Sequence, residues 1–170
     1  MDISPPLPTR RAVFGLGATA ALGVIGWRIA SPSPAAAEPA APFRLTDADW
    51  RKRLPPAAYV VLREGSTESP FSSPLNTEHR RGTFVCAGCA LPLFTSKTKF
   101  DSGTGWPSFY DHLPHAIGEK GDAGFGMERT EVHCARCAGH LGHVFNDGPQ
   151  PTGLRYCMNG VAMRFQPPTA

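Results

Sequence analysis

Phe84-Val85-Cys86-Ala87-Gly88-Cys89 and Val132-His133-Cys134-Ala135-Arg136-Cys137 are two matching segments, and they decide the fold of this chain. In each, a short strand-like run leads into a tight turn that carries two cysteines. Two residues between the cysteines let both sulfur atoms face one ion, and two such turns complete a tetrahedral set of thiolates. Four thiolates leave no open coordination position, so we expect a structural metal site that fastens distant parts of the chain together.

Two other interpretations of the paired cysteines stay open. The pairs could form two disulfides, or one of them could be a redox-active Cys-x-x-Cys. A metal is favoured because the two pairs match. Zinc suits a permanent four-cysteine site because it has no redox chemistry, although iron accepts the same ligands.

Cys157 is the fifth cysteine and has no obvious partner. A lone cysteine in a chain with histidines elsewhere is a candidate nucleophile. If residues 154–159 form a strand, Arg155, Cys157 and Asn159 share one face. The guanidinium of Arg155 would then favour the thiolate form of the sulfur. The alternative is a small buried hydrophobic side chain, which is the commoner role of a free cysteine.

Three further residues are candidates to act beside Cys157. Trp106 lies between glycines and a proline, in a turn where an indole suits the wall of a binding site, although it could equally cap the core. His140 and His143 lie among glycines and could donate a proton near neutral pH. They could instead be structural, or they could bind a second, catalytic metal together with Cys157, as in a hydrolase.

The composition indicates one β-rich domain with a tail. The chain has 170 residues, and its 18 glycines and 18 prolines favour turns and short strands. Runs of β-branched and aromatic residues predict an antiparallel β domain. We place these strands at 82–86, 91–94, 131–134, 143–145 and 161–165. The net charge of +3 comes from scattered basic residues, which argues against a nucleic-acid partner.

Two short helices are predicted ahead of the strands. The first covers 45–54, with Thr46 as its cap, and two prolines end it. The second covers 57–64, and Gly65 follows at its C-terminus.

Residues 1–41 resemble a signal peptide and linker, and we place the domain at 42–170. Arg10 and Arg11 precede a weakly apolar run rich in alanine and glycine, which resembles a twin-arginine (Tat) signal. Small residues up to Ala37 fit a cleavage site. We therefore expect export to the periplasm, with an uncleaved membrane anchor facing the periplasm as the alternative.

Together, these segments resemble the methionine-R-sulfoxide reductase family, MsrB. The motifs occur in that family's order, and the likeness extends from about residue 45 to residue 165. They are Cys86-x-x-Cys89, Ser102-Gly103-Thr104-Gly105-Trp106-Pro107-Ser108-Phe109, Cys134-x-x-Cys137, Gly139-His140-Leu141-Gly142-His143-Val144-Phe145 and Arg155-Tyr156-Cys157-Met158-Asn159-Gly160.

The resemblance implies a mainly β fold of antiparallel sheets, the β-tent, with short N-terminal helices. It also implies one structural zinc ion per chain, and it assigns the site residues. The zinc ligands would be Cys86, Cys89, Cys134 and Cys137; the catalytic residues would be Cys157, His140, His143 and Asn159; the substrate-binding residues would be Trp106, Phe109 and Arg155.

The implied activity is that of a peptide-methionine (R)-S-oxide reductase, which repairs proteins under oxidative stress. A thiolate of Cys157 would attack the sulfoxide sulfur and leave methionine and a sulfenic acid. Many relatives carry a resolving cysteine where this chain has Thr104, so a thioredoxin-like protein or another external thiol would recycle Cys157. We expect a monomer. The alternative from another class is a zinc-knuckle binding module in which Cys157 is dispensable.

Overall fold

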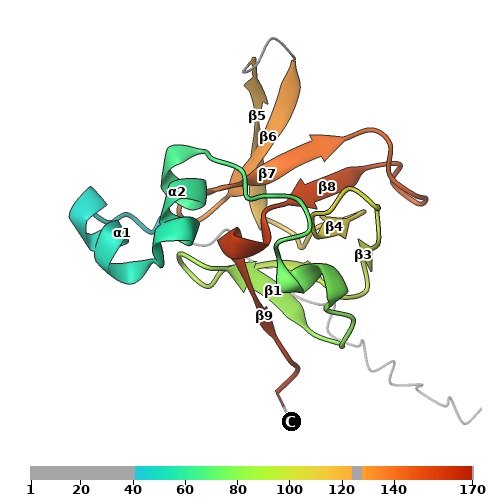
Figure 1. Ribbon diagram of the computed structural model, residues 1–170, viewed down its shortest axis with the longest axis horizontal. Helices are drawn as coiled ribbons and strands as arrows, with labels where there is room; N and C mark the ends of the chain where they lie inside the picture. The colour runs from blue at the N-terminus through green and yellow to red at the C-terminus, as the bar shows by residue number, and fades with distance from the viewer. Residues whose placement is uncertain (1–40, 124–127, 170) are drawn as a thin grey trace, which may run out of the picture. The chain divides into compact units, whose positions relative to one another are not determined.

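The fold is mainly β, as the sequence predicts. The computed structural model describes residues 41–123 and 128–169, so the predicted signal peptide lies almost wholly outside the described residues and stays a prediction. Two antiparallel sheets form the body of the domain, and two short α-helices precede them (Figure 1). Within the described ranges, no helix has the length and apolar character needed to cross a membrane.

Both predicted helices are present. α1 covers Asp47–Arg53, and the side chain of Thr46 accepts a hydrogen bond from the Asp49 backbone N–H, as an N-cap does. α2 covers Pro56–Glu64 and ends at Gly65, which has φ 72°. Pro56 begins α2, where its missing N–H costs nothing, rather than only ending the helix before it.

The five predicted strands are confirmed, with boundaries shifted by a few residues. The smaller sheet has the order β2 (Pro92–Thr95), β1 (Thr83–Cys86), β9 (Met163–Gln166). The larger sheet has the order β3 (Lys99–Phe100), β4 (Ser108–Phe109), β8 (Arg155–Met158), β7 (His140–Phe145), β6 (Arg129–Cys134), β5 (Ile117–Asp122). Two short 3₁₀ helices lie between these elements: η1 (Pro74–Thr77) before β1, and η3 (Gly160–Ala162) between β8 and β9.

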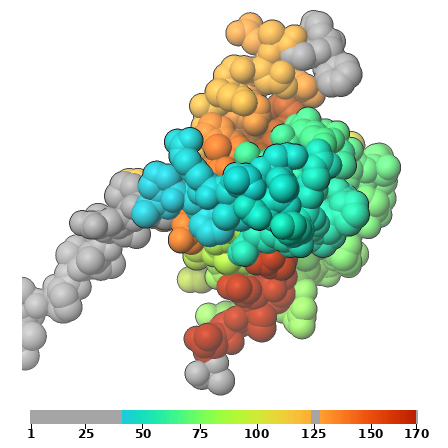
Figure 2. All heavy atoms as spheres, turned by 90° about the vertical axis from the view of Figure 1, so that its left-hand side faces the viewer, coloured from blue at the N-terminus to red at the C-terminus, as the bar shows by residue number. Residues whose placement is uncertain are grey.

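Aromatic side chains from both sheets make the centre of the core. Phe109 of β4 stacks on Phe94 of β2 at 4.4 Å between ring centroids, and it meets Phe84 of β1 edge-on at 4.9 Å. All three are fully buried, and burying such a side chain contributes about 1.5–3 kcal/mol. α2 packs against β7 and η3, and Figure 2 shows the two helices spread across one face.

The register of the larger sheet fixes the surroundings of Cys157. His143 of β7 is directly opposite Cys157 of β8, and Ser108 of β4 is opposite it on the other side. Residues paired across antiparallel strands project to the same face. The sheet therefore brings a thiol, an imidazole and a hydroxyl together.

Gly142 allows β7 and β8 to approach each other beside this site. A Cβ atom at Gly142 would lie 2.1 Å from the backbone oxygen of Cys157, whereas one at Gly121 in β5 would meet nothing within 4 Å. Gly142→Ala is therefore expected to lower the free energy of unfolding by about 3 kcal/mol, or the melting temperature by about 10 °C. Gly121→Ala is the matched control, and equal melting temperatures for the two variants would contradict the prediction.

Candidate functional site

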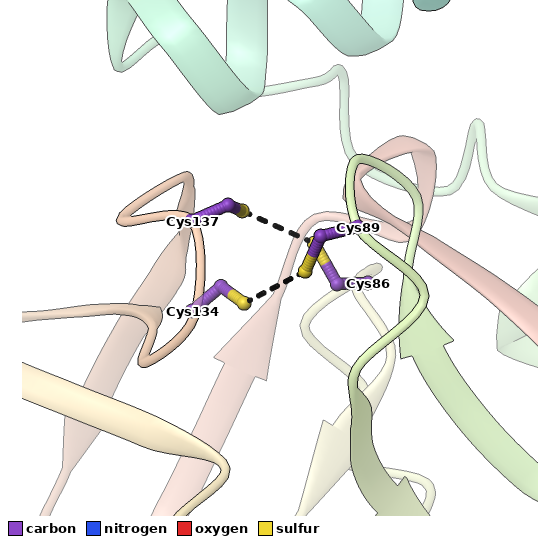
Figure 3. Close-up of side chains that lie close together, drawn as sticks. All are labelled: Cys86, Cys89, Cys134 and Cys137. Atoms are coloured by element: carbon purple, nitrogen blue, oxygen red, sulfur yellow. Dashed lines mark hydrogen bonds between the residues drawn. The ribbon is translucent and has the colours of Figure 1, made fainter. Parts of the chain in front are cut away.

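The four paired cysteines converge in one buried cluster (Figure 3). Their sulfur atoms all lie within 4.8 Å of one another, with Cys86 Sγ 3.7 Å from Cys137 Sγ and Cys89 Sγ 3.5 Å from Cys134 Sγ. Thiolates at about 2.3 Å around a tetrahedral ion are about 3.8 Å apart, whereas disulfide-bonded sulfurs are about 2.05 Å apart. The geometry fits a metal ion and not two disulfides.

The cluster joins the two sheets. Cys86 is the last residue of β1 in the smaller sheet, and Cys134 is the last residue of β6 in the larger one. Hydrogen bonds among the four sulfurs, with that to Cys134 the largest for its three neighbours, lower the pKa of Cys89 and Cys137 and raise the pKa of Cys86 and Cys134, as expected for closely spaced groups that share protons. A metal ion held by these sulfurs would therefore fasten one sheet to the other.

Three arginines hold the two cysteine turns in place. Arg53 of α1 donates to the carbonyl of Gly88 at 2.7 Å. Arg63 of α2 donates to the carbonyl of Cys137 at 3.0 Å, and Arg136 donates to that of Cys89 at 3.2 Å. The helices thus support the cysteine cluster from outside the sheets.

A second, catalytic metal is not supported by the side-chain geometry. Among residues 41–123 and 128–169, the cysteine cluster is the one group of three or more histidines, cysteines or carboxylates whose ligand atoms converge. His140, His143 and Cys157 form no such group. The positions of these side chains therefore do not support the hydrolase alternative.

Cys157 opens onto a small pocket of about 140 Å³. The half-buried thiol shares the pocket with Trp106, His143 and Asn159, three of the residues that the sequence singled out. The other lining residues are Thr67, Arg129, Gly142 and Phe145. An aromatic wall, a thiol, an imidazole and an amide around one small space suit a ligand with an apolar part and a polar oxygen.

His143 is oriented by a carboxylate that the sequence analysis did not identify. Its Nε2 lies 2.9 Å from Oδ2 of Asp122 at the end of β5. The same carboxylate oxygen accepts a hydrogen bond from Arg129 at 2.7 Å. A carboxylate fixed on one ring nitrogen sets the tautomer and leaves the other nitrogen as the candidate for proton transfer.

His140 lies behind His143 and does not line the pocket. It is buried, and its Nδ1 is 3.1 Å from Oε1 of Glu131. Burial lowers the pKa of His140, although the hydrogen bond with Glu131 opposes this, so the surroundings favour the neutral ring. Its Nε2 is buried and has no hydrogen-bond partner among the described residues. The ring contacts His143 edge-on at 5.4 Å between centroids.

Glu68 links two walls of the pocket and was also missed by sequence reasoning. Its backbone N–H donates to Oδ1 of Asn159 at 2.9 Å, and its carbonyl accepts from Nε1 of Trp106 at 3.1 Å. Its carboxylate accepts the backbone N–H groups of Gly160 at 2.5 Å and Val161 at 3.1 Å. These four bonds fix the indole and the amide relative to each other.

Arg155 is held beside Cys157 by a carboxylate. It donates two hydrogen bonds of 2.8 Å to Asp147, and its guanidinium lies 4.4 Å from the ring centroid of Phe145. Arg155 favours the thiolate of Cys157, as the strand pattern predicts. Burial is the larger effect, however, and the pKa of Cys157 is raised above its usual value.

Hydroxyl groups surround the other side of the sulfur. Oγ1 of Thr104 lies 3.9 Å from Sγ of Cys157. Ser102 connects Thr104 to the buried Ser108, with both Oγ–Oγ distances 2.8 Å. Thr104 and Ser108 both act to lower the pKa of Cys157, against the effect of burial.

The prediction that Phe109 helps to form the substrate wall is corrected by the structure. Phe109 is fully buried, is not among the lining residues, and stacks on Phe94 in the core. Side chains alternate along a strand, and its neighbour Ser108 is the residue paired with Cys157. Phe109 therefore projects to the opposite face of the sheet.

The raised pKa of Cys157 has a measurable consequence. Alkylation by iodoacetamide requires the thiolate, so its rate at Cys157 should still rise with pH where a free thiol, of pKa about 8.5, levels off. Thr104→Val removes one hydroxyl that favours the thiolate and should slow alkylation further at pH 8. Peptide mapping by mass spectrometry would measure both rates, with the chain unfolded in urea as the reference. A plateau below pH 8 in the folded chain would contradict the prediction.

Comparison with known proteins gives one consistent result. A family profile described as the SelR domain matches residues 54–167. A protein of Agrobacterium fabrum, named peptide methionine sulfoxide reductase MsrB, is 54% identical over 123 residues, which cover 72% of this chain and 91% of that protein. Proteins of the same name from Leptospira interrogans and Pseudomonas entomophila are 52% and 56% identical, over 71% and 70% of this chain and 93% and 92% of theirs.

Proposed function

Because the chain belongs to the MsrB family of peptide methionine sulfoxide reductases, and is thus an oxidoreductase, we propose that it reduces the R epimer of methionine sulfoxide in oxidised proteins. The observation that carries this proposal is the pocket in which Cys157 meets Trp106, His143 and Asn159. The indole suits the methyl group of the substrate, and the polar side chains suit the sulfoxide oxygen. Distinct walls around one small space support discrimination between the two epimers.

The first chemical step oxidises Cys157 by two electrons. Its sulfur attacks the sulfoxide sulfur, and the oxygen then moves to Cys157 as the transient S–S bond breaks. The sulfoxide S–O bond is thus replaced by an S–O bond on Cys157, and the products are methionine and a sulfenic acid. The oxygen and the thiol proton end together as the sulfenic hydroxyl. His143, held by Asp122, passes the proton, while buried His140 and the amide of Asn159 keep the polar side of the pocket in place.

The second step requires a reductant from outside the chain. Cys157 is 3.9 Å from the hydroxyl of Thr104, and the other four cysteines form the metal cluster. A thioredoxin-like protein or a small thiol would therefore attack the sulfenic acid, release water and form a mixed disulfide. A second external thiol would then release reduced Cys157.

We propose zinc as the metal of the four-cysteine cluster, with a structural role. The support is the set of four buried thiolates without an open position. We also propose that the enzyme acts in the periplasm after twin-arginine export, on the basis of Arg10 and Arg11 before the apolar leader. We further propose that it acts as a monomer. Metal content by mass spectrometry, cell fractionation and light scattering would test these three points separately.

A coupled assay tests the activity. NADPH consumption would be followed with the purified chain, thioredoxin and thioredoxin reductase, on the R and S epimers of dabsylated methionine sulfoxide. Turnover of the R epimer alone is expected. Activity with dithiothreitol but not with thioredoxin would keep the reductase and change the reductant. A folded, metal-loaded chain that turned over neither epimer with either reductant would overturn the proposal in favour of a binding module.

A further inference from the structure

We propose that a hollow beside Trp106 binds an apolar side chain that flanks the methionine sulfoxide in a protein substrate. This hollow, which we call the flank groove, has a volume of about 200 Å³ and is distinct from the Cys157 pocket. Phe71, Phe100 and Trp106 are its aromatic residues. The proposal rests on the proposed function and names the feature of the substrate that a second site would recognise.

The exposure and the backbone conformation of Phe71 are the first observations that support the proposal. Its exposed fraction of 73% is the largest among the large apolar side chains that the structure describes. Its backbone has φ 61°, a conformation that is costly for a bulky residue, and its N–H donates to the carbonyl of Gly105 at 2.7 Å. An aromatic side chain that is both strained and exposed next to a binding pocket indicates a contact surface rather than a core residue.

The groove is built on a fixed support. Nδ2 of Asn76 donates to the carbonyl of Gly105 at 2.9 Å, and Nζ of Lys99 donates to the carbonyl of Asn76 at 2.8 Å. Gly105 itself has φ 93°, and a Cβ atom there would lie 2.9 Å from the backbone nitrogen of Phe71. The loop that carries Trp106 and the loop that carries Phe71 are thus joined closely by backbone contacts.

Trp106 lines both the flank groove and the Cys157 pocket. In an extended peptide, side chains two positions apart lie on the same side, about 7 Å from each other. Two groups that contact opposite faces of one aromatic ring, each at a van der Waals distance of about 3.5–4.0 Å, are about the same distance apart. A peptide with methionine sulfoxide in the pocket would therefore place the residue two positions away in the flank groove.

The size of the groove also favours one side chain over a free small molecule. Pockets for small-molecule ligands measure about 300–1,000 Å³, which is larger than the flank groove. Burial of one leucine or phenylalanine side chain against three aromatic residues would be favourable. The occupant that we infer is an apolar residue of a flexible, oxidised protein segment.

A peptide series tests the inference with the full-length chain. The substrates are blocked Gly-Gly-Met(R-sulfoxide)-Gly-Gly and its variants with leucine two positions before or after the sulfoxide, with N-acetylmethionine R-sulfoxide as the substrate that has no flank. For the wild type, leucine at one of these positions should raise kcat/KM by about tenfold. Phe71→Ala should remove that gain and leave kcat/KM for N-acetylmethionine R-sulfoxide within about twofold.

Two further variants sharpen the comparison. Leu45→Ala changes another exposed apolar side chain, which lies outside the groove, and should keep the full gain from leucine. Phe71→Asp is tolerated by the backbone, since aspartate is among the residues that adopt positive φ. It should replace the preference for leucine with one for lysine at the same peptide position.

Several outcomes would overturn the inference. One is equal kcat/KM for the glycine and leucine peptides in the wild type, and another is a gain that persists in Phe71→Ala. A dimer by light scattering that dissociates in Phe71→Ala would assign the surface to a second copy of the chain. Normal turnover of N-acetylmethionine R-sulfoxide in these cases would leave the reductase function standing, whereas no turnover of any substrate would overturn both.

Discussion

Cys157→Ser is expected to reduce the turnover of methionine R-sulfoxide by at least about a thousandfold, whichever reductant is supplied. The sulfur is the atom that would accept the sulfoxide oxygen, and a serine hydroxyl is far less nucleophilic and cannot be oxidised in this way. The measurement is the initial rate of NADPH consumption with thioredoxin, repeated with dithiothreitol.

The control for Cys157→Ser is the integrity of the rest of the domain. Cys157 does not belong to the metal cluster, so the variant should keep the metal content and the melting temperature of the wild type within about 5 °C. Retention of a tenth or more of the wild-type rate would show that Cys157 is not the nucleophile.

Cys86→Ser is expected to abolish both metal binding and cooperative folding. Cys86 is fully buried and sits where β1 meets the cluster that joins the two sheets. Binding of a structural zinc ion is worth about 10–16 kcal/mol, which is comparable to the whole stability of a domain, about 5–15 kcal/mol. Loss of one ligand should therefore leave an unfolded or partly folded chain.

Mass spectrometry of the intact metal complex and circular dichroism would test this prediction. Cys157→Ser is the matched control, since it also replaces one cysteine by serine but leaves the four ligands in place. A Cys86→Ser protein that melted cooperatively within a few degrees of the wild type would contradict a structural role for the metal. The same metal analysis of the wild type distinguishes zinc from iron.

The parts of the fold that local patterns determine could be predicted from the sequence. Thr46 caps the start of α1 through its side chain, and Gly65 ends α2 through its backbone conformation. Both effects act within one helical turn. The spacing of Cys86 and Cys89, and its repetition later in the chain, likewise indicated the cluster because the ligand geometry is encoded locally.

Other elements could not be predicted because their partners are distant in sequence. β5 contains two glycines and three charged residues between Ile117 and Asp122, a poor strand composition, and it exists because β6 pairs with it along its length. β4 has only two residues, too few to show a period. The core position of Phe109 follows from that pairing and not from the motif around it.

The same reasoning explains which site residues were missed. Glu68 lies in a loop with no distinctive pattern, and its hydrogen bonds reach Trp106, Asn159 and the residues after Asn159. Asp122 faces His143 only because β5, β6 and β7 are adjacent in the sheet. No local signal in the sequence marks either residue as a partner of the side chains that line the pocket.

The pairing of β1 with β9 sets the order in which the domain can be completed during synthesis. Thr83 pairs with Gln166, so β1 can gain this partner only after the much later strand β9 has been synthesised. The four cysteines, by contrast, are all available once Cys137 has emerged. The metal cluster can therefore form on a nascent chain that still lacks β9, and a chain shortened before Met163 would hold its metal ligands yet leave the edge of β1 open to other strands.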